Sequence, residues 1–429
     1  MSRATRVLVG GVGVLASLTL AACGGDDEDG GGGAEQLDLV IGVTAPLTGD
    51  FSDFGPPGAK AAELAGEQLT ETIEEAGLDD TVELIVEDSQ SDPVAVVQAA
   101  RGLVGQGASC LVGAWTSAET IPLGESVALP EQVLMISPGS TSNEVREIDD
   151  PDGFVNRTTP PDLFQAPTLA SYIAEQLGGA QGRVLNLGVR NDAYGTGFAD
   201  SFVEAWEKAG GEIGEQVVYD PTQPNYDTEA AQIASGDPDA WVIIEFPDTY
   251  AKVGPALART GSWDPARSFA PDGLASSSVP DDVGREATDG MVGSTVGTPE
   301  GSEAGERFFE LYEGFAPQDV EPQTYATRAF DATILCYLAA VAAGSTDGAE
   351  MAAELIEITN PPGEKLTWLQ LDQAVEALQA GEDIDFDGAS GPIEMDELGD
   401  ATGGVYDIWR FKGGEYEVFD ETPIVKKVE

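Results

Sequence analysis

One acidic segment near the C-terminal end has the spacing of a calcium loop. Asp383, Asp385 and Asp387 alternate along the chain, and Glu394 stands where such a loop places its bidentate glutamate. Carboxylates at this spacing can surround a Ca²⁺ ion. A calcium loop of this type leads into a helix, however, and the residues at 398–404 (LGDATGG) do not favour a helix. We therefore predict neither a metal nor another cofactor.

The chain of 429 residues contains no histidine, which restricts its chemistry more than any motif does. Relays of the Ser-His-Asp or Cys-His type and zinc sites with histidine ligands are excluded. The segment 194–197 (YGTG) lacks the third glycine of a dinucleotide-binding loop and the lysine of a P-loop. We therefore expect a protein that is not an enzyme and binds no nucleotide.

The N-terminus has the organisation of a bacterial lipoprotein signal. Two arginines precede an apolar stretch at 7–20, which is too short to span a membrane. The sequence LAAC at 20–23 is the pattern in which a peptidase cuts before a cysteine that becomes lipidated, here Cys23. We predict a signal peptide at 1–22, a lipidated Gly/Asp-rich tether at 23–36, and an extracytoplasmic protein anchored to the membrane. The alternative is a buried strand that happens to contain a cysteine.

The other two cysteines, Cys110 and Cys336, form an even pair in a chain that we expect to be exported. Exported proteins reach an oxidising compartment, where disulfides persist. We predict a disulfide between them, and the alternative is two separately buried thiols.

The charge is strongly acidic, with 20 Lys and Arg against 77 Asp and Glu and a net charge of −57. Such a surface repels phosphate backbones, so we expect no binding to nucleic acid. Solubility in salty surroundings and a general bias toward acidic residues both explain this charge.

Short apolar segments alternate with amphipathic segments along the chain. The expected strands are 38–45, 82–86, 110–112, 133–136, 183–189, 212–218 and 240–244, and the expected helices are 58–75, 93–104, 197–208, 227–233 and 250–259. This alternation predicts an α/β fold with doubly wound parallel sheets, repeated on both sides of a seam at 154–161. Two facing units would enclose a small molecule at the carboxyl ends of their strands.

The last part of the chain has a different pattern. We expect a long helix at 323–343, a helical stretch at 374–378, and a hairpin formed by 406–411 and 416–419. The pattern alone assigns none of these to either unit.

Five segments resemble, in order, the leucine/isoleucine/valine-binding family of ABC-transporter receptors, the type I periplasmic binding proteins. They are 41–55 (IGVTAPLTGDFSDFG), 111–122 (LVGAWTSAETIP), 134–142 (LMISPGSTS), 191–198 (NDAYGTGF) and 387–400 (DGASGPIEMDELGD). The resemblance implies two flavodoxin-like lobes joined by a three-strand hinge. It places 37–155 plus 298–390 in lobe 1 and 156–297 plus 391–429 in lobe 2.

The resemblance also implies residues that would hold the charged end of an amino acid. Ser117 and Thr141 match hydroxyl donors to the ligand carboxylate, and Gly139 matches a carbonyl acceptor for its ammonium group. Asp272 matches the acidic partner of that ammonium group, which is usually a glutamate. The alternatives are helix N-caps for the two hydroxyls and a turn-forming Asp-Gly for Asp272.

Three aromatic residues match cleft positions of the same family. Tyr194 and Phe54 would close over the ligand from the two lobes, and Tyr325 would line the side-chain pocket. Core packing is the alternative for each of them. The segment 245–249 departs from the family pattern, and we expect it to determine specificity.

We therefore expect a monomeric binding protein that captures an amino acid of the branched-chain type, or a related amide or small carboxylate. It would deliver this ligand to the permease of an ABC importer. The alternative is a sensor component that presents a small molecule to a membrane receptor. A hydrolase is disfavoured because the chain has no histidine and no nucleophile with an evident base.

Overall fold

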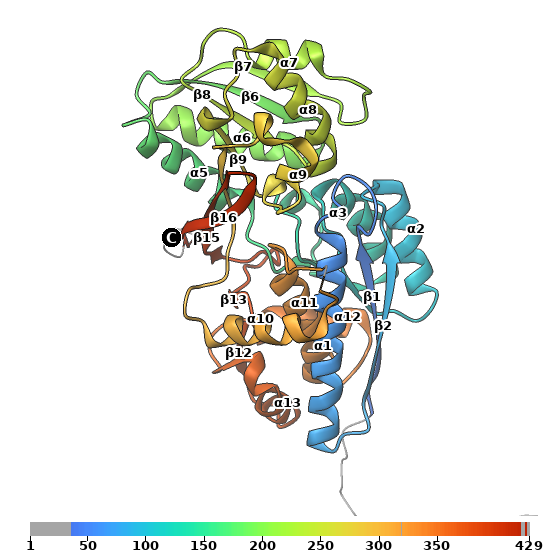
Figure 1. Cartoon of the computed structure of the whole chain (residues 1–429). Helices are drawn as coiled ribbons and strands as arrows, with labels where there is room; N and C mark the ends of the chain where they lie inside the picture. The colour runs from blue at the N-terminus through green and yellow to red at the C-terminus, as the bar shows by residue number, and fades with distance from the viewer. Residues whose placement is uncertain (1–35, 319, 422–424, 427–429) are drawn as a thin grey trace, which may run out of the picture. The chain divides into compact units, whose positions relative to one another are not determined.

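The structure is a computed structural model that describes residues 36–318, 320–421 and 425–426. The signal peptide expected at 1–22, most of the tether expected at 23–36, and Cys23 lie outside the described residues. The described residues belong to one compact unit, in which Figure 1 shows two α/β lobes. The expected α/β architecture with parallel sheets is therefore confirmed.

Lobe 1 is built on a five-stranded parallel sheet with the strand order β2-β1-β3-β4-β5. Its strands are β1 (Asp38–Ala45), β2 (Thr81–Asp88), β3 (Cys110–Val112), β4 (Leu134–Ser137) and β5 (Val155–Arg157). The helices of this lobe are α1 (Gly55–Ala76), α2 (Pro93–Val104), α3 (Ser117–Leu123), α4 (Leu129–Glu131), α10 (Glu303–Phe315), α11 (Ala326–Ala343), α12 (Gly348–Ile358) and α13 (Leu371–Gln379). Helix α11 packs along α1 and against the sheet, so a late segment of the chain completes the core of the first lobe.

Lobe 2 is built on a seven-stranded sheet with the order β16-β15-β10-β9-β8-β6-β7. Its strands are β6 (Val184–Arg190), β7 (Glu212–Tyr219), β8 (Ala240–Ile244), β9 (Ser268–Ala270), β10 (Val292–Val296), β15 (Tyr406–Lys412) and β16 (Glu415–Glu421). Its helices are α5 (Asp162–Gln176), α6 (Ala193–Lys208), α7 (Asp227–Ile233), α8 (Pro247–Thr260) and α9 (Val279–Val283). The expected C-terminal hairpin is present, and it joins this sheet antiparallel to β10.

Several expected helices have different ends in the structure. The helix expected at 323–343 begins at Ala326, because the preceding residues form a turn. The helix expected at 197–208 begins at Ala193, because the Asp192 side chain caps it by accepting from the Gly195 amide at 2.9 Å. Gly195 and Gly197, near the start of this helix, are positions of close packing.

The acidic segment with calcium-loop spacing lies in a small third sheet, of the order β11-β12-β13. These strands are β11 (Glu364–Thr367), β12 (Ile384–Gly388) and β13 (Gly391–Pro392). Asp385 and Asp387 alternate on β12, and the Lys365 ammonium group lies 3.8 and 3.1 Å from their carboxylates. The segment is thus a strand whose charge a lysine compensates, and the described residues contain no group of three or more metal-ligating side chains.

The chain crosses between the lobes three times, after β5, after β10 and after β13, where β14 (Gly403–Gly404) pairs with β17 (Val425–Lys426). The third crossing is tied to lobe 1 by buried ion pairs. Arg157 and Arg146 both bind the Asp400 carboxylate, and Arg146 also lies 3.0 Å from Asp396. The residue boundaries that we expect for the two lobes stay a prediction.

A disulfide joins Cys110 in β3 to Cys336 in α11, which confirms the predicted pairing. Both residues are fully buried, and their Cα atoms are 5.9 Å apart. The bond therefore links the early and the late segment of lobe 1, which are separated in the sequence by lobe 2. Within the described residues, α11 is also the one helix long and apolar enough to cross a membrane, but most of it is buried in the lobe 1 core.

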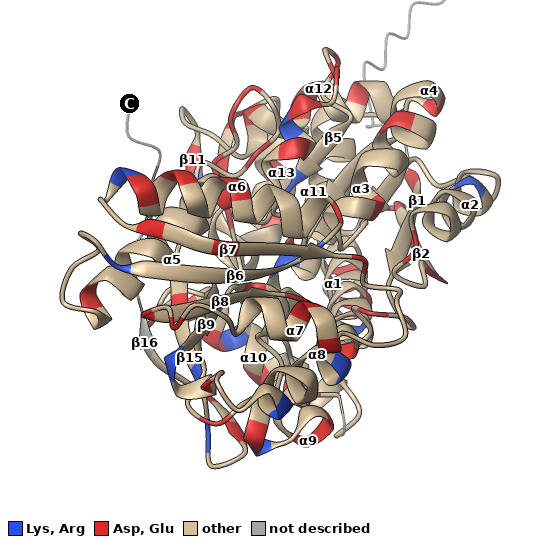
Figure 2. Cartoon of the chain, turned by 90° about the horizontal axis from the view of Figure 1, so that it is seen from above, with Lys and Arg blue, Asp and Glu red and all other residues tan. Residues whose placement is uncertain are grey.

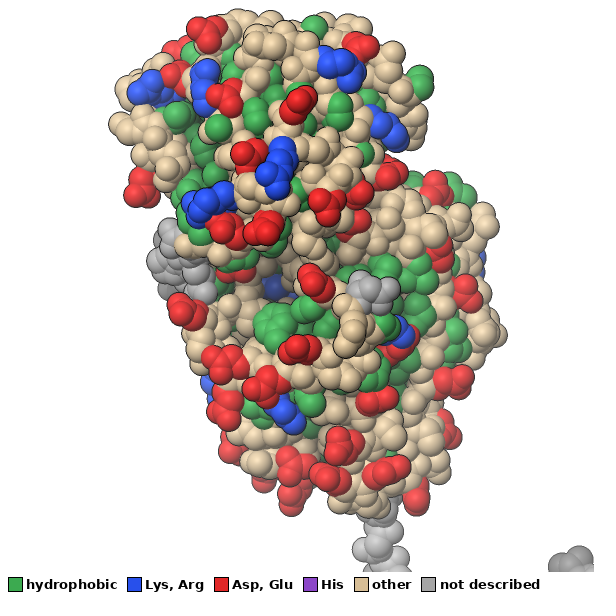
Figure 3. All heavy atoms as spheres, in the orientation of Figure 1, with side chains coloured by type: hydrophobic (Ala, Val, Ile, Leu, Met, Phe, Trp, Pro, Cys, Tyr) green, Lys and Arg blue, Asp and Glu red, His purple; other side chains and the backbone are tan. Residues whose placement is uncertain are grey.

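Acidic side chains are spread over both lobes. Figure 2 shows them on helices and loops throughout the described part of the chain, and Figure 3 shows them on both lobes of the face in view. The negative charge is thus not confined to one patch on that face.

Candidate ligand-binding site

The first wall of the candidate site is the start of α3 together with the loop after β4. Ser117 is the first residue of α3, and its hydroxyl accepts a hydrogen bond from the Ser142 amide at 3.1 Å. The N-cap of α3 is Thr116, paired with Glu119 in a capping box. Ser142 caps the following short helix. The alternative that Ser117 and Thr141 are N-caps is therefore wrong.

The loop that carries Thr141 is held in shape by a buried arginine. Arg157 donates from Nη1 to the carbonyl oxygens of Ser140 and Ser142, both at 2.9 Å, and binds Asp400 through Nε. These bonds fix the residues on both sides of Thr141. The Thr141 hydroxyl is buried and lies close enough to the Asp162 carboxylate to lower its pKa, but it makes no hydrogen bond of good geometry with the described residues.

Gly139 lies in the same loop at a point of close backbone approach. A Cβ atom at this position would lie 2.7 Å from the carbonyl oxygen of Trp115. Such a contact is too short, so only glycine fits without movement of one of the two segments. The structure thus places Gly139 beside the segment that leads into α3.

Asp272, which follows β9, brings together residues of both lobes. Its carboxylate accepts hydrogen bonds from the Tyr194 hydroxyl at 3.0 Å, from Gln165 Nε2 at 3.2 Å and from the Tyr325 hydroxyl. Tyr194 also accepts from the Gly273 amide at 3.0 Å. Burial raises the pKa of Asp272, although these hydrogen bonds act in the opposite direction. A turn-forming role does not explain a carboxylate in this buried position.

Asp162, which sequence reasoning missed, is the second buried carboxylate of the site. It is the first residue of α5, and its amide donates to the Thr141 carbonyl at 2.7 Å. Neither of its carboxylate oxygens has a hydrogen-bond partner of good geometry among the described residues. Burial raises its pKa well above the ordinary value and the charge of Asp272 raises it further, whereas Thr141 and Arg157 lower it. A ligand that donates hydrogen bonds would satisfy this group.

Five aromatic rings meet between the lobes. Phe51 stacks on Phe54 at 4.3 Å between ring centroids and also contacts Phe246 of lobe 2 at 4.6 Å. Tyr194 stacks on Phe246 at 4.9 Å, and Phe54 meets the edge of Tyr325 at 5.6 Å. All five side chains are buried. Beside the polar groups, the site therefore has an apolar part with contributions from both lobes.

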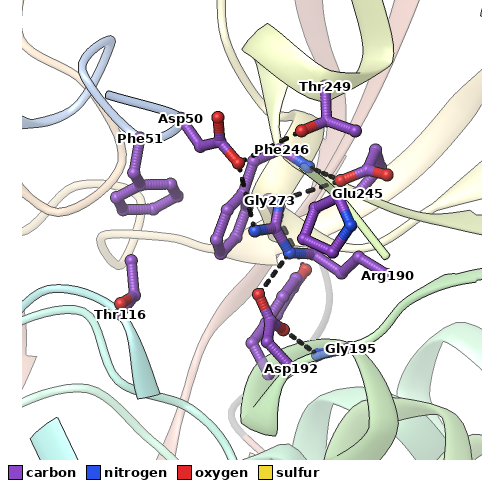
Figure 4. A network of polar contacts seen from close by, with 12 residues as sticks. Asp50, Phe51, Thr116, Arg190, Asp192, Gly195, Glu245, Phe246, Thr249 and Gly273 are labelled. Atoms are coloured by element: carbon purple, nitrogen blue, oxygen red, sulfur yellow. Dashed lines mark hydrogen bonds and ion pairs between the residues drawn. The ribbon is translucent and has the colours of Figure 1, made fainter. Parts of the chain in front are cut away.

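A buried arginine adjoins this aromatic group (Figure 4). Arg190 at the end of β6 binds Asp192 at 2.6 Å and Glu245 at 2.8 Å, and lies 3.4 Å from Asp50 of lobe 1. Its guanidinium also stands 3.7 Å above the Phe246 ring. Burial raises the pKa of Glu245 to about 7, although the charge of Arg190 opposes that shift.

The segment 245–249, expected to determine specificity, thus supplies Glu245 and Phe246 to this region of the cleft. Sequence reasoning gave no sign of Arg190, because an arginine at a strand end is ordinary. The same holds for Gln165, which reaches the site only because α5 packs against β10. The structure places Phe54, Tyr194, Asp272 and Tyr325 where the lobes meet, and Ser117, Gly139 and Thr141 in neighbouring loops of lobe 1. That these seven residues bind a ligand stays a prediction.

Chemically, this arrangement suits binding. It places two buried carboxyl groups and a buried hydroxyl close together.

Comparisons with known proteins agree with this geometry. The sequence profile of the periplasmic binding protein family matches residues 38–403. A Leu/Ile/Val-binding protein homologue of Brucella melitensis is 33% identical over 181 residues, which are 41% of this chain and 46% of that relative's length. The chemotactic signal transduction system substrate-binding protein BasB of Halobacterium salinarum is 28% identical over 319 residues, covering 72% of each chain.

Solved structures share the fold. The leucine-binding protein LivK of Thermotoga maritima superimposes with a TM-score of 0.72 at 23% identity, covering 90% of this chain and 99% of its own. A solute-binding protein of an ABC transporter from Rhodopseudomonas palustris, in complex with benzoate, gives a TM-score of 0.68 at 17% identity, covering 91% and 98%. Proteins of this family bind solutes and are not enzymes. The chain therefore belongs to the type I periplasmic binding proteins, the family that includes the Leu/Ile/Val-binding proteins.

Proposed function

We propose that this protein captures an α-amino acid with an apolar side chain in the cleft between its lobes. The ammonium group would bind at Asp162 and Asp272, and the carboxylate at Ser117 and Thr141. The protein would then hand the amino acid to the permease of an ABC importer.

The observation that carries this proposal is the pair of buried carboxylates. Asp162 and Asp272 are both enclosed, and the charge of Asp272 disfavours ionisation of Asp162. In addition, neither oxygen of Asp162 has a hydrogen bond of good geometry to the described residues, although Thr141 lies close enough to lower its pKa. Unpaired buried carboxylates are costly, so a cationic group of the ligand would be bound strongly there.

This pair distinguishes an amino acid from the other ligand class among proteins of this fold. Benzoate, bound by the protein of Rhodopseudomonas palustris, has a carboxylate and no ammonium group. Such a ligand would bring a negative charge beside two acidic groups and no cation to offset it. The homologues that carry the name Leu/Ile/Val-binding protein also favour an amino acid.

The apolar part of the site favours an aliphatic side chain. The rings of Phe51, Phe54, Phe246 and Tyr325 pack against one another where the lobes meet. A branched aliphatic side chain would bury its surface against these rings.

Titration calorimetry tests the proposal with the twenty amino acids and benzoate. We expect binding of one or a few apolar amino acids and no binding of benzoate. Replacing Asp272 with asparagine should weaken that binding by roughly 10- to 100-fold, because a charged hydrogen-bond acceptor is lost. Asp372→Asn is the matched control, since Asp372 is exposed on α13 and lies outside every segment expected to contact the ligand. Binding of benzoate, or equal affinity of the Asp272→Asn protein, would overturn the proposal.

The lipid anchor is a separate part of the proposal and rests on the LAAC sequence at 20–23. Metabolic labelling with radioactive palmitate should mark the protein in a bacterial host, and Cys23→Ala should abolish the label. Unchanged labelling of the variant would remove Cys23 as the site of lipid attachment.

A sensor component is the second candidate function, and one relative favours it. The BasB protein of Halobacterium salinarum is a substrate-binding protein of a chemotactic signal transduction system. In that case the closed protein would bind a membrane receptor in place of a permease. The neighbouring genes distinguish the two: permease and ATPase genes favour the importer, and a receptor gene favours the sensor.

A further inference from the structure

The loop between β1 and α1, residues 46–54, contacts lobe 2 through two carboxylates. Asp50 accepts a hydrogen bond from the Thr249 hydroxyl at 3.1 Å and lies 3.4 Å from Arg190. Asp53 accepts from the hydroxyls of Ser276 and Ser278, each at 2.5 Å. Both carboxylates belong to lobe 1, and all four of their partners belong to lobe 2.

The partners of Asp50 are already in place without it. Arg190 is paired with Asp192 and Glu245 inside lobe 2, and it stacks on Phe246 (Figure 4). Its charge therefore stays compensated when the lobes separate. Asp50 adds a contact in the closed form and leaves no buried charge unpaired in an open form. These are the properties of a reversible contact.

The loop that presents the two carboxylates is fixed to lobe 1. Asp88 accepts from the amides of Leu47 and Thr48, at 3.0 and 3.2 Å, and from the Thr48 hydroxyl at 2.7 Å. The Phe51 amide donates to Ser91 at 3.0 Å. Because these bonds lie within one lobe, closure does not have to order the loop, and the contacts across the cleft cost little conformational entropy.

One glycine in the loop permits this geometry. Gly49 has a φ of +92°, and a Cβ atom there would lie 2.3 Å from the carbonyl oxygen of Gln90. A side chain would therefore displace the loop just before Asp50. The position of Asp50 depends on this residue, although Gly49 itself touches no part of lobe 2 that the structure describes.

We propose that loop 46–54 is a latch in which Asp50 and Asp53 hold the lobes closed and so set how long the ligand stays bound. The two residues act on affinity through the closed state and do not contact the proposed ammonium or carboxylate subsites. The claim that the latch sets how long the ligand stays bound rests on the proposed function. The claim that the latch favours closure of the lobes does not rest on it.

Hydrogen–deuterium exchange of the full-length protein tests the latch. The Asp50→Ala/Asp53→Ala protein should exchange faster than the wild type in the lobe 2 peptides that contain Thr249 and Ser278, which the substitutions leave intact. Gly49→Ala should have the same effect, although it removes no charge. Glu71→Ala, an exposed acidic position on α1, is the matched control and should change neither peptide.

The measurement is made without ligand and with L-leucine as the probe. With L-leucine, the double variant should also release the amino acid about ten-fold faster, a change in proportion to a few part-buried polar contacts. Exchange and release equal to the wild type would overturn the latch. If L-leucine binds to none of the proteins, the proposed function loses support, but the exchange without ligand still decides whether Asp50 and Asp53 favour closure.

Discussion

Removing the disulfide between Cys110 and Cys336 should destabilise lobe 1 by several kcal/mol. The bond closes a loop between residues 226 apart in the sequence. In the chain-entropy description, a crosslink of that span lowers the entropy of the unfolded chain and contributes roughly 5 kcal/mol at 25 °C. This contribution is comparable to the whole free energy of unfolding of an average domain, so the effect should be measurable without ambiguity.

The magnitude depends little on how the lobes unfold. If lobe 2 stays folded while lobe 1 unfolds, the flexible part of the loop is shorter, by about the length of that lobe. Because loop entropy grows with the logarithm of length, the contribution then falls only to about 4.5 kcal/mol. The packing lost by replacing the two buried sulfur atoms is the smaller term, on the order of 1 kcal/mol for each.

Denaturant unfolding of the wild type with and without reductant gives the bond's contribution, since no side chain is replaced. The Cys110→Ala/Cys336→Ala protein gives the same quantity plus the packing loss. Variants that keep only Trp115 in lobe 1 or only Trp241 in lobe 2 can show by fluorescence which lobe responds, and lobe 1 should shift more. Equal unfolding midpoints in the presence and absence of reductant, with the thiols shown to be free, would refute the reasoning.

Two further predictions concern buried groups at the site. Burial raises the pKa of Glu119 from 4.5 to about 7; its contribution to stability is therefore complete below about pH 4.5 and is lost as the pH rises through 7, a loss on the order of 3 kcal/mol. Urea unfolding at pH 5 and pH 8 should show that the Glu119→Gln protein gains stability relative to the wild type at the higher pH. The exposed control Glu125→Gln should gain none. Parallel stability-against-pH profiles of Glu119→Gln and the wild type would contradict this. A Cβ atom at Gly273 would lie 2.5 Å from the Glu245 carbonyl oxygen, so Gly273→Ala should weaken amino-acid binding by more than about ten-fold. The control Gly102→Ala meets no atom within 4 Å and should bind as the wild type does in calorimetry, whereas tight binding by Gly273→Ala would show that the loop of Asp272 is not fixed as described.

Much of the fold could be predicted from the sequence because its strands are short, apolar and buried. The strands at 38–45, 110–112 and 240–244 have the expected bounds. Helices α3 and α5 were missed because each contains an internal proline, Pro122 and Pro167, which reads as a break in a helix.

The site could be predicted only in part, since its residues come from segments far apart in the chain. Ser117 and Tyr194 stand within segments that resemble a known family, and Asp272 matches a family position outside those segments, so the roles of all three could be inferred. The role of Asp162 could not be inferred, because a single acidic residue after two prolines predicts only the start of a helix. Its role appears only when α5 is placed beside the loop of Thr141.

The central claim is that the ligand's ammonium group meets Asp162 and Asp272 while its carboxylate meets Ser117 and Thr141. Calorimetry with L-leucine, N-acetyl-L-leucine and 3-methylbutylamine tests it most directly, because the two analogues each lack one charged group. We predict that L-leucine binds and that both analogues bind at least about 100-fold more weakly. Binding of N-acetyl-L-leucine as tight as that of L-leucine would contradict the claim, since the buried carboxylates would then have no cation to hold.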